Sequence, residues 1–314
     1  MKAPDIDFYS STNIKSYNLN ATMRHQLEVL DSLDVYTRRH CENVANITCR
    51  ICEYLHCSKA FIIYATINAY LHDVGKMFIP PEILQKPSKL TDEEYEVMKT
   101  HTTLGYNLCM KDLDLRPYAI GALYHHEALN GTGYPNGVTK KDIPYAAQII
   151  RVADEYDAIV SKRQYKTHIN ISEALKLLIK DARPDDYMRT VALDHLSSDS
   201  KLGKISPRIL KVLFHVVIDD TLYEISGVDN YITYLKEQIK RLEMVQKYEI
   251  KMNTSKKEKQ KAYYRQGMEM LLQPGENFDN YNTLLKEYTA ALHLRLDTRK
   301  KLYEEIRIIK KLEI

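Results

Sequence analysis

The sequence predicts an all-α protein, in which a helical bundle is followed by a helical C-terminal extension. Apolar residues recur at helical spacing along most of the 314 residues. Convincing runs of alternating apolar and polar residues, bounded by hairpin turns, are absent from the sequence. After about residue 218 glycine becomes rare, and apolar residues fall at spacings that resemble a coiled coil.

Local signals support individual helices within this pattern. The stretch "KAFIIYATINAYLHDVGK" predicts a buried helix that ends near Gly75. Thr91 and Glu94 form a capping box at the start of a further helix, which is expected to contain His101. Besides that capped helix, the expected helices cover about 21–56, 59–75, 115–128, 144–162, 172–182, 186–196 and 206–217.

The chain is expected to have three parts. Residues 1–20 are polar and expected to be irregular, 21–218 form the main helical domain, and 219–314 form a helical extension. The extension has two coiled-coil-like seams, formed by Ile232, Leu235, Ile239 and Leu242 and by Leu302, Ile306, Ile309 and Leu312. We expect a hairpin that packs on itself or on a second copy, which would make a homodimer. The alternative is a set of extra helices that merely extend the core.

Composition excludes several classes of protein. A net charge of +3 gives no indication of DNA binding. No apolar run reaches the length of a membrane span, and the N-terminus lacks a signal-peptide pattern, so we expect a cytoplasmic protein without membrane association. The five cysteines include one CxxC, Cys49 to Cys52, but no second CxxC completes a zinc site. We expect them to be reduced packing residues.

Glycine and metal-ligand residue types are concentrated in one window. Six of the ten glycines lie between residues 75 and 137. The same window or its edge holds His72, Asp73, His101, His125 and His126. Alone, His40 or His101 on a helix would be a core residue, whereas Asp154 in a strongly apolar helix needs a partner, because burying an unpaired carboxylate is costly. Five histidines and two aspartates together can hold two metal ions that clamp a phosphate.

The motifs that carry these residues resemble an HD-GYP domain, a helical subclass of the HD metal-dependent phosphohydrolase superfamily. The matching segments are "HDVGK" (72–76), "IPPEILQKPSKLTDEEYEVMKTH" (79–101), "HHEALNGTGYPNG" (125–137), "IIRVADEYDAIVSKRQYK" (149–166) and "GKISPRILKVLF" (203–214). The resemblance covers about residues 30–215. It implies an HD-type helical bundle within 21–218, followed by the coiled-coil-like extension.

The resemblance also implies a bacterial signalling enzyme, a phosphodiesterase that hydrolyses a cyclic dinucleotide, chiefly cyclic di-GMP, by attack of a metal-bridging hydroxide. Its cofactors would be two divalent ions, iron or manganese. One ion would be held by His40, His72, Asp73 and Asp154, and the other by Asp73, His101, His125 and His126, with Asp73 as the bridge.

The same resemblance assigns the remaining site residues. Asp73 and Lys76 would be catalytic, because Lys76 would stabilise charge on the scissile phosphate. The implied substrate-binding residues are Lys76, Tyr134, Arg163 and Lys166. Alternatives stay open: Arg163 and Lys166 would otherwise form a solvated basic turn, and the loop of Tyr134 would be purely structural.

Two positions depart from the family pattern. Asn130 replaces the usual Asp ahead of Gly-Thr-Gly-Tyr-Pro, which removes a charge from the loop. Tyr36 stands where members with three metals carry a Glu, so we expect two ions rather than three. Glu127, after the paired histidines, is expected to accept a hydrogen bond from a metal-bound imidazole.

Two other functions remain open at this point. One is an HD phosphohydrolase that acts on another nucleotide, including cyclic GMP-AMP. The other is a non-catalytic signalling module that binds a cyclic dinucleotide or a protein. All seven expected ligand positions carry the expected residue, which favours catalysis.

Overall fold

The computed structural model describes residues 35–161, 170–183 and 202–312, and all regular structure in these ranges is helical. The prediction of an all-α fold is confirmed. The β-type pairing recorded in these ranges is an isolated bridge between Asn130 and Thr139. The chain divides into two compact units. The N-terminal unit runs to Ile218 and includes the chain from Ile309, and the C-terminal unit is Asp219–Ile308.

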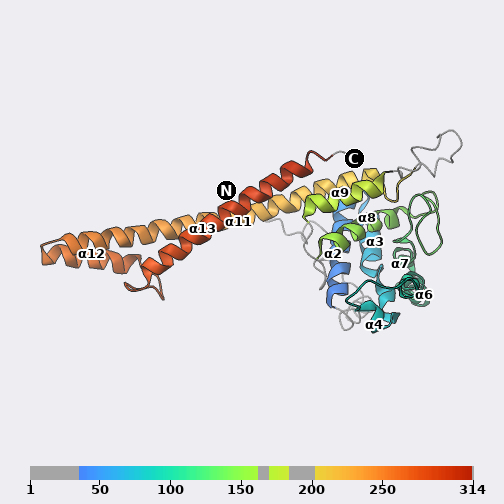
Figure 1. Ribbon diagram of the computed structural model, residues 1–314, viewed down its shortest axis with the longest axis horizontal. Coiled ribbons are helices and arrows are strands. Elements are labelled where there is room, and N and C mark those ends of the chain that lie inside the picture. The colour runs from blue at the N-terminus through green and yellow to red at the C-terminus, as the bar shows by residue number, and fades with distance from the viewer. Residues whose placement is uncertain (1–34, 162–169, 184–201, 313–314) are drawn as a thin grey trace. The chain divides into compact units, whose positions relative to one another are not determined.

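The N-terminal unit is a bundle of short helices (Figure 1). Its elements are α2 (Val35–Tyr54), α3 (Lys59–Leu71), η1 (Val74–Phe78), α4 (Pro81–Leu84), α5 (Asp92–Lys99), α6 (His101–Lys111), η2 (Arg116–Tyr118), α7 (Ala119–Tyr124), α8 (Tyr145–Val160) and α9 (Ile171–Ala182). Helix α2 packs against α3 and α8, and α6 packs against α7 and η1. The core contains Ile51, Ile150, Leu175, Leu178 and Leu213, all almost fully buried.

Two predicted helix starts have their capping partners in place. The backbone N–H of Glu94 donates to Thr91 Oγ1 over 3.3 Å, and the backbone N–H of Thr91 donates to Glu94 Oε2 over 2.8 Å. The capping box is therefore confirmed. The buried helix predicted to end near Gly75 is α3, which begins after Ser58, whose hydroxyl accepts from the N–H of Phe61. It ends earlier than predicted, at Leu71.

Three further helix boundaries differ from the prediction, and each has a local cause. His101 begins α6 instead of lying inside a helix, because the chain is interrupted at Thr100. The helix expected over 115–128 ends at Tyr124, where the N–H groups of the next turn bond to carbonyls at the end of α7. The expected helix 206–217 does not stop there. It continues as α11 (Pro207–Thr254), because no proline or turn signal interrupts it. The expected helix 186–196 and the start of 21–56 lie outside the described residues.

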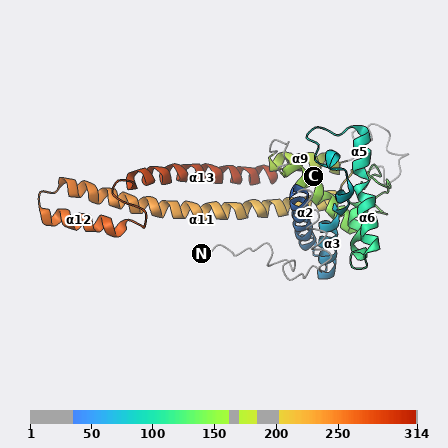
Figure 2. The same cartoon turned by 90° about the horizontal axis from the view of Figure 1, so that it is seen from below.

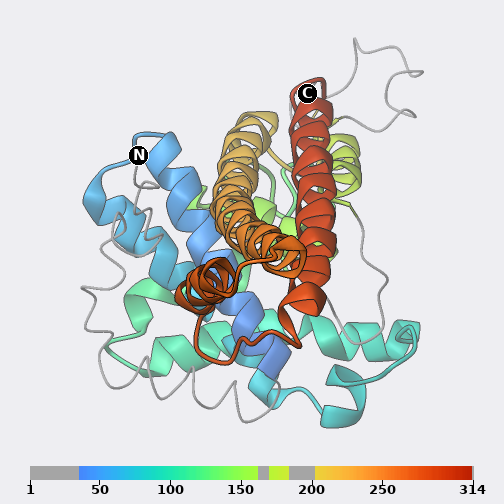
Figure 3. The same ribbon diagram turned by 90° about the vertical axis from the view of Figure 1, so that its left-hand side faces the viewer.

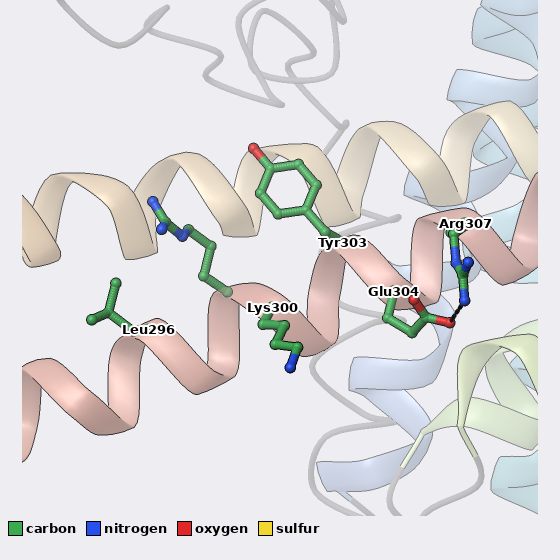
Figure 4. A pocket seen from close by; sticks show the side chains of 6 residues that line it. Leu296, Lys300, Tyr303, Glu304 and Arg307 are labelled. Atoms are coloured by element: carbon green, nitrogen blue, oxygen red, sulfur yellow. Dashed lines mark hydrogen bonds and ion pairs between the residues drawn. The ribbon is translucent and has the colours of Figure 1, made fainter.

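The C-terminal unit packs on itself. It contains most of α11, together with α12 (Glu258–Leu271) and α13 (Tyr281–Ile309). Helix α12 folds back beside α11, and α13 runs along α11 (Figure 2), as the view along the helices also shows (Figure 3). Leu242, Val245, Met268 and Tyr281 form its buried cluster. A shallow hollow on α13 is lined by side chains of that helix alone, among which Arg307 donates to Glu304 over 2.6 Å (Figure 4). It contains none of the predicted site residues.

Candidate metal centre

Asp73 lies at the centre of the predicted cluster. It follows α3 and is 1% exposed. Its two oxygens face different histidines. Oδ2 lies 3.7 Å from His40 Nε2 and 3.3 Å from His72 Nε2. Oδ1 lies 3.4 Å from His101 Nε2 and 3.8 Å from His125 Nε2. A carboxylate whose oxygens face two groups of imidazoles has the arrangement that bridging between two cations requires.

Asp154 on α8 is the second buried carboxylate of the cluster. Its Oδ1 lies 2.9 Å from His40 Nε2 and 3.9 Å from His72 Nε2, and its Oδ2 lies 3.9 Å from His126 Nδ1. The structure thus brings together all seven residues that the sequence predicted as metal ligands. Three groups have ligand atoms close enough to share an ion: His101, His125 and His126; His40, His72 and Asp73; and His72, His125 and Asp154.

Three histidines of the cluster have their tautomer set by the main chain. In each of them Nδ1 lies within hydrogen-bond distance of a backbone carbonyl, which can only accept. The pairs are His72 with Ala69 at 2.6 Å, His101 with Met98 at 2.7 Å, and His125 with Gly121 at 2.9 Å. The proton of each neutral ring is therefore on Nδ1, and the lone pair of Nε2 points into the cluster.

These nitrogen lone pairs lack hydrogen-bond donors. Among the described residues, His72 Nε2 and Asp73 Oδ1 are buried without a hydrogen-bond partner. His101 Nε2 and His125 Nε2 lie 3.2 Å apart, although both are acceptors. Leaving such atoms buried and unsatisfied is costly. A divalent cation would satisfy them, and imidazole with carboxylate is a donor set that iron, manganese and zinc accept. The residues present therefore fit metal ions.

The ionisation states of the cluster agree with this chemistry. Burial lowers the pKa of His101 to about 4 and that of His126 to about 3, so both rings are neutral at pH 7. Burial alone would raise the pKa of Asp73, but the Lys76 ammonium outweighs it and holds that pKa well below its usual range. Neutral imidazoles and an ionised carboxylate are the forms that bind metals.

His40 differs from the other histidines because carboxylates bond to both of its nitrogens. Nε2 is 2.9 Å from Asp154 Oδ1, and Nδ1 is 2.7 Å from Asp157 Oδ2. Burial opposes protonation, yet the hydrogen bonds to Asp154 and Asp157 raise the pKa of His40 to about 9. Sequence reasoning missed Asp157, although its spacing of three residues from Asp154 places both carboxylates on one face of α8.

Lys76 and Tyr134 lie at the edge of the cluster. Lys76 Nζ donates to Asp73 Oδ2 over 2.5 Å, and its side chain is 15% exposed. The ring of Tyr134 stacks on His126, with centroids 4.7 Å apart and 26° between the planes. Lys99 Nζ lies 5.7 Å from the centre of the Tyr134 ring, a contact that sequence reasoning did not predict. The predicted substrate residues Arg163 and Lys166 lie outside the described residues.

The prediction for Glu127 was wrong. Its Oε1 accepts from the N–H of Asn136 over 2.7 Å, and its Oε2 accepts from the N–H of Val138 over 3.1 Å. Both oxygens are occupied by main-chain donors of the loop, so the carboxylate supports the loop instead of an imidazole. Asn130 keeps a turn-forming role, since its Oδ1 accepts from the N–H and the hydroxyl of Thr132.

Comparison with known proteins identifies the type of domain. The model of the HD domain family matches residues 22–191. A cyclic di-GMP phosphodiesterase of Thermotoga maritima is 42% identical over 156 residues, which cover 48% of this chain and 42% of that protein. The cyclic di-GMP phosphodiesterase response regulator RpfG of Xanthomonas campestris is 35% identical over 159 residues, covering 50% of this chain and 42% of RpfG.

A third relative carries a different substrate in its name. The 3'3'-cGAMP-specific phosphodiesterase 3 of Vibrio cholerae is 35% identical over 151 residues, which cover 48% of this chain and 33% of that protein. The chain spans less than half the length of each of these three relatives. In the part of the chain that the structure describes, every helix is too short or too polar to cross a membrane.

Proposed function

This chain belongs to the HD domain family and to its HD-GYP branch, and we propose that it is a metal-dependent phosphodiesterase acting on a cyclic dinucleotide, chiefly cyclic di-GMP. The observation that carries the proposal is the position of the two Asp73 oxygens, which face separate groups of imidazoles. A module that binds no metal has no need for buried acceptor atoms that remain unsatisfied without a cation.

We propose two ions, iron or manganese, in this cluster. His40, His72, Asp73 and Asp154 would hold one, and Asp73, His101, His125 and His126 the other. When bound, such ions lower the pKa of water and neutralise the charge of a phosphodiester. Tyr36 supports two ions rather than three, because it lies one helical turn before His40, where it offers a phenol and no carboxylate, and its side chain is 45% exposed.

The chain's own residues supply the remaining chemistry. Lys76 lies beside Asp73, and its ammonium can donate to a phosphate oxygen as negative charge develops there. Tyr134 would form the wall of the substrate pocket next to His126, with its ring as the surface that a nucleobase meets. Arg163 and Lys166 are proposed to hold the substrate's phosphates, for which a guanidinium is well suited by its two parallel donors.

The experiment that tests this proposal is a substrate panel with metal quantification. The full chain, loaded with Mn²⁺ or Fe²⁺, is incubated with cyclic di-GMP, 3'3'-cGAMP and common nucleotides, and products are separated by chromatography. Hydrolysis of cyclic di-GMP ahead of the others is expected. The name of the Vibrio relative makes 3'3'-cGAMP the second candidate. Faster hydrolysis of 3'3'-cGAMP would replace cyclic di-GMP as the proposed substrate. A protein with two ions per chain that hydrolyses none of them would be a binding module.

The C-terminal unit is proposed to join two copies of the chain. Its helices expose large apolar side chains, including Leu222, Tyr263, Met270 and Leu294, which are 46% to 80% exposed. Light scattering on the full chain should give the mass of a dimer, and Leu294→Glu should shift it toward the monomer. A monomer at all concentrations would exclude this role.

A further inference from the structure

Asp157 lies behind the metal cluster, on the side of His40 that faces away from the other ligands. It is 3% exposed and sits on α8, three residues after Asp154. Its Oδ2 is 2.7 Å from His40 Nδ1, while the opposite ring nitrogen, Nε2, faces Asp154 and Asp73. One imidazole therefore connects an outer carboxylate to the two carboxylates of the cluster.

This partner distinguishes His40 from the three histidines whose tautomers are set by the main chain. His72, His101 and His125 place Nδ1 against backbone carbonyls, which are neutral. A carboxylate accepts the same hydrogen bond but adds a negative charge, which raises the basicity of the nitrogen that faces a metal. In the cluster, Nδ1 of His40 thus faces an anionic acceptor, whereas Nδ1 of those three histidines faces a neutral one.

The orientation of Asp157 is itself fixed. Its Oδ1 accepts from Asn43 Nδ2 over 3.0 Å and from Ser161 Oγ over 2.8 Å. Asn43 comes from α2, the helix of His40, and Ser161 follows α8. With Oδ1 held by two donors, Oδ2 is left to accept from His40, and rotation of the carboxylate would break all three bonds. Such an arrangement holds a ligand more accurately than a single hydrogen bond does.

From this geometry we infer that Asp157 is a positioning residue for metal binding. It fixes His40 with its proton on Nδ1 and with Nε2 directed at the ion shared with His72, Asp73 and Asp154. Asp157 does not touch that ion, and it acts only through the imidazole. This inference rests on the metal cluster of the proposed function. It adds to the proposed function that the binding of one of the two ions depends on a residue outside the ligand set.

The test is a metal titration of the full chain without substrate. Metal-free wild type and Asp157→Asn are titrated with Mn²⁺, and binding is followed by calorimetry and by the electron paramagnetic resonance of free Mn²⁺. Loss of an outer carboxylate typically weakens metal binding by roughly 10- to 100-fold. We expect that loss for one ion, with the other ion unchanged. Asp142→Asn, which removes the same charge from an exposed position of this unit, should bind both ions as the wild type does.

Two results would overturn the inference. One is a folded Asp157→Asn that binds both ions with wild-type affinity, and the other is an equal loss for both ions. Circular dichroism reports whether the variant keeps its helices. If it does not, ¹⁵N chemical shifts of the His40 ring in Zn²⁺-loaded wild type decide: a protonated Nδ1 with metal on Nε2 supports the inference, and the reverse refutes it. Because no substrate is present, failure here leaves cyclic dinucleotide hydrolysis by the wild type untouched.

Discussion

The carboxylate of Glu127 accepts a hydrogen bond of 2.7 Å from the main-chain N–H of Asn136. Its second oxygen accepts from Val138, so one buried side chain holds the exit of the loop that contains Tyr134. The loop entrance is held from the same segment, since the N–H of Tyr134 donates to the carbonyl of His126 over 3.2 Å. The paired histidines and the loop that follows them are therefore one rigid piece.

Glu127→Gln should loosen this piece. The amide has one acceptor oxygen where the carboxylate has two, so one main-chain donor loses its acceptor and the other loses the charge of its partner. We expect the free energy of unfolding to fall by about 1–3 kcal/mol, and KM for the cyclic dinucleotide to rise as Tyr134 loses its fixed position. Urea denaturation and steady-state kinetics measure the two effects. Glu82→Gln, at an exposed position of α4, is the matched control, and equal denaturation midpoints for both variants would contradict the prediction.

A pair of glycines tests the close packing of the same loop. A Cβ built on Gly133 would lie 2.3 Å from the backbone nitrogen of Ala128, whereas one built on Gly227, inside α11, meets nothing within 4 Å. Gly133→Ala should therefore destabilise the protein, since backbone must move. Gly227→Ala should stabilise it by about 0.5–1 kcal/mol, the usual advantage of alanine within a helix. Thermal unfolding compares the two, and stabilisation by Gly133→Ala would show that the loop is not tightly packed.

The sequence was sufficient to predict the fold class and to name the seven side chains that the structure brings together as candidate metal ligands. Helical periodicity is a local property, and the capping box of Thr91 and Glu94 depends on residues only three apart. The predicted ligands His72, Asp73, His125 and His126 occur in adjacent pairs inside specific motifs. Asp154 was recognised from the cost of burying a carboxylate in an apolar helix. Each of these signals can be read without knowing how the helices pack.

What the sequence could not supply depends on packing between distant segments. Asp157 became relevant only when α8 lay beside α2, because its partner His40 is 117 residues away. Glu127 has donors 9 and 11 residues along a loop whose path no periodicity predicts. The end of α7 before His125 was also missed, since helix ends are set by which carbonyls the following turn reaches.

Metal removal should destabilise the protein without unfolding its helices. The cations would satisfy His72 Nε2 and Asp73 Oδ1, which are otherwise buried without partners in the described residues. Saturating Mn²⁺, at about 100 times its Kd, should add about 2.7 kcal/mol to the free energy of unfolding relative to chelated protein. Differential scanning calorimetry gives the shift. Asp73→Asn should abolish the Mn²⁺ response while keeping the circular dichroism spectrum, and a full response in that variant would exclude Asp73 as a ligand.

Lys76→Met should lower kcat with little change in metal content. Lys76 Nζ bonds to Asp73 at the edge of the cluster, where it can meet developing phosphate charge. Removing one such donor costs roughly 10²–10³-fold in kcat. Kinetics with metal analysis separates this effect from lost ligands, and Lys89→Met, an exposed lysine, is the control. Unchanged kcat with two bound ions would remove Lys76 from the reaction.

The metal-free protein should be most stable near pH 6.5 and lose stability on both sides. On the acid side, folded His101 has a pKa of about 4 and His126 of about 3, against an ordinary 6.5. As the pH falls below 6.5, the unfolded chain takes up protons that the folded chain does not, so stability is lost down to about pH 4 and below. On the alkaline side, folded His40 has a pKa of about 9, so its contribution is complete below 6.5 and is lost as the pH rises to 9.

Urea denaturation of chelator-treated protein from pH 4 to pH 10 measures the free energy of unfolding on the acid and alkaline limbs of this pH profile. His101→Gln removes one titrating group and should make the acid limb shallower without changing the alkaline limb, because the ring of His101 is 1% exposed and neutral above pH 6.5. An alkaline limb that is flat between pH 6.5 and 9 would mean that His40 is not held as the cation by Asp154 and Asp157. An acid limb of equal slope in His101→Gln and the wild type would mean that the buried imidazoles do not control acid stability.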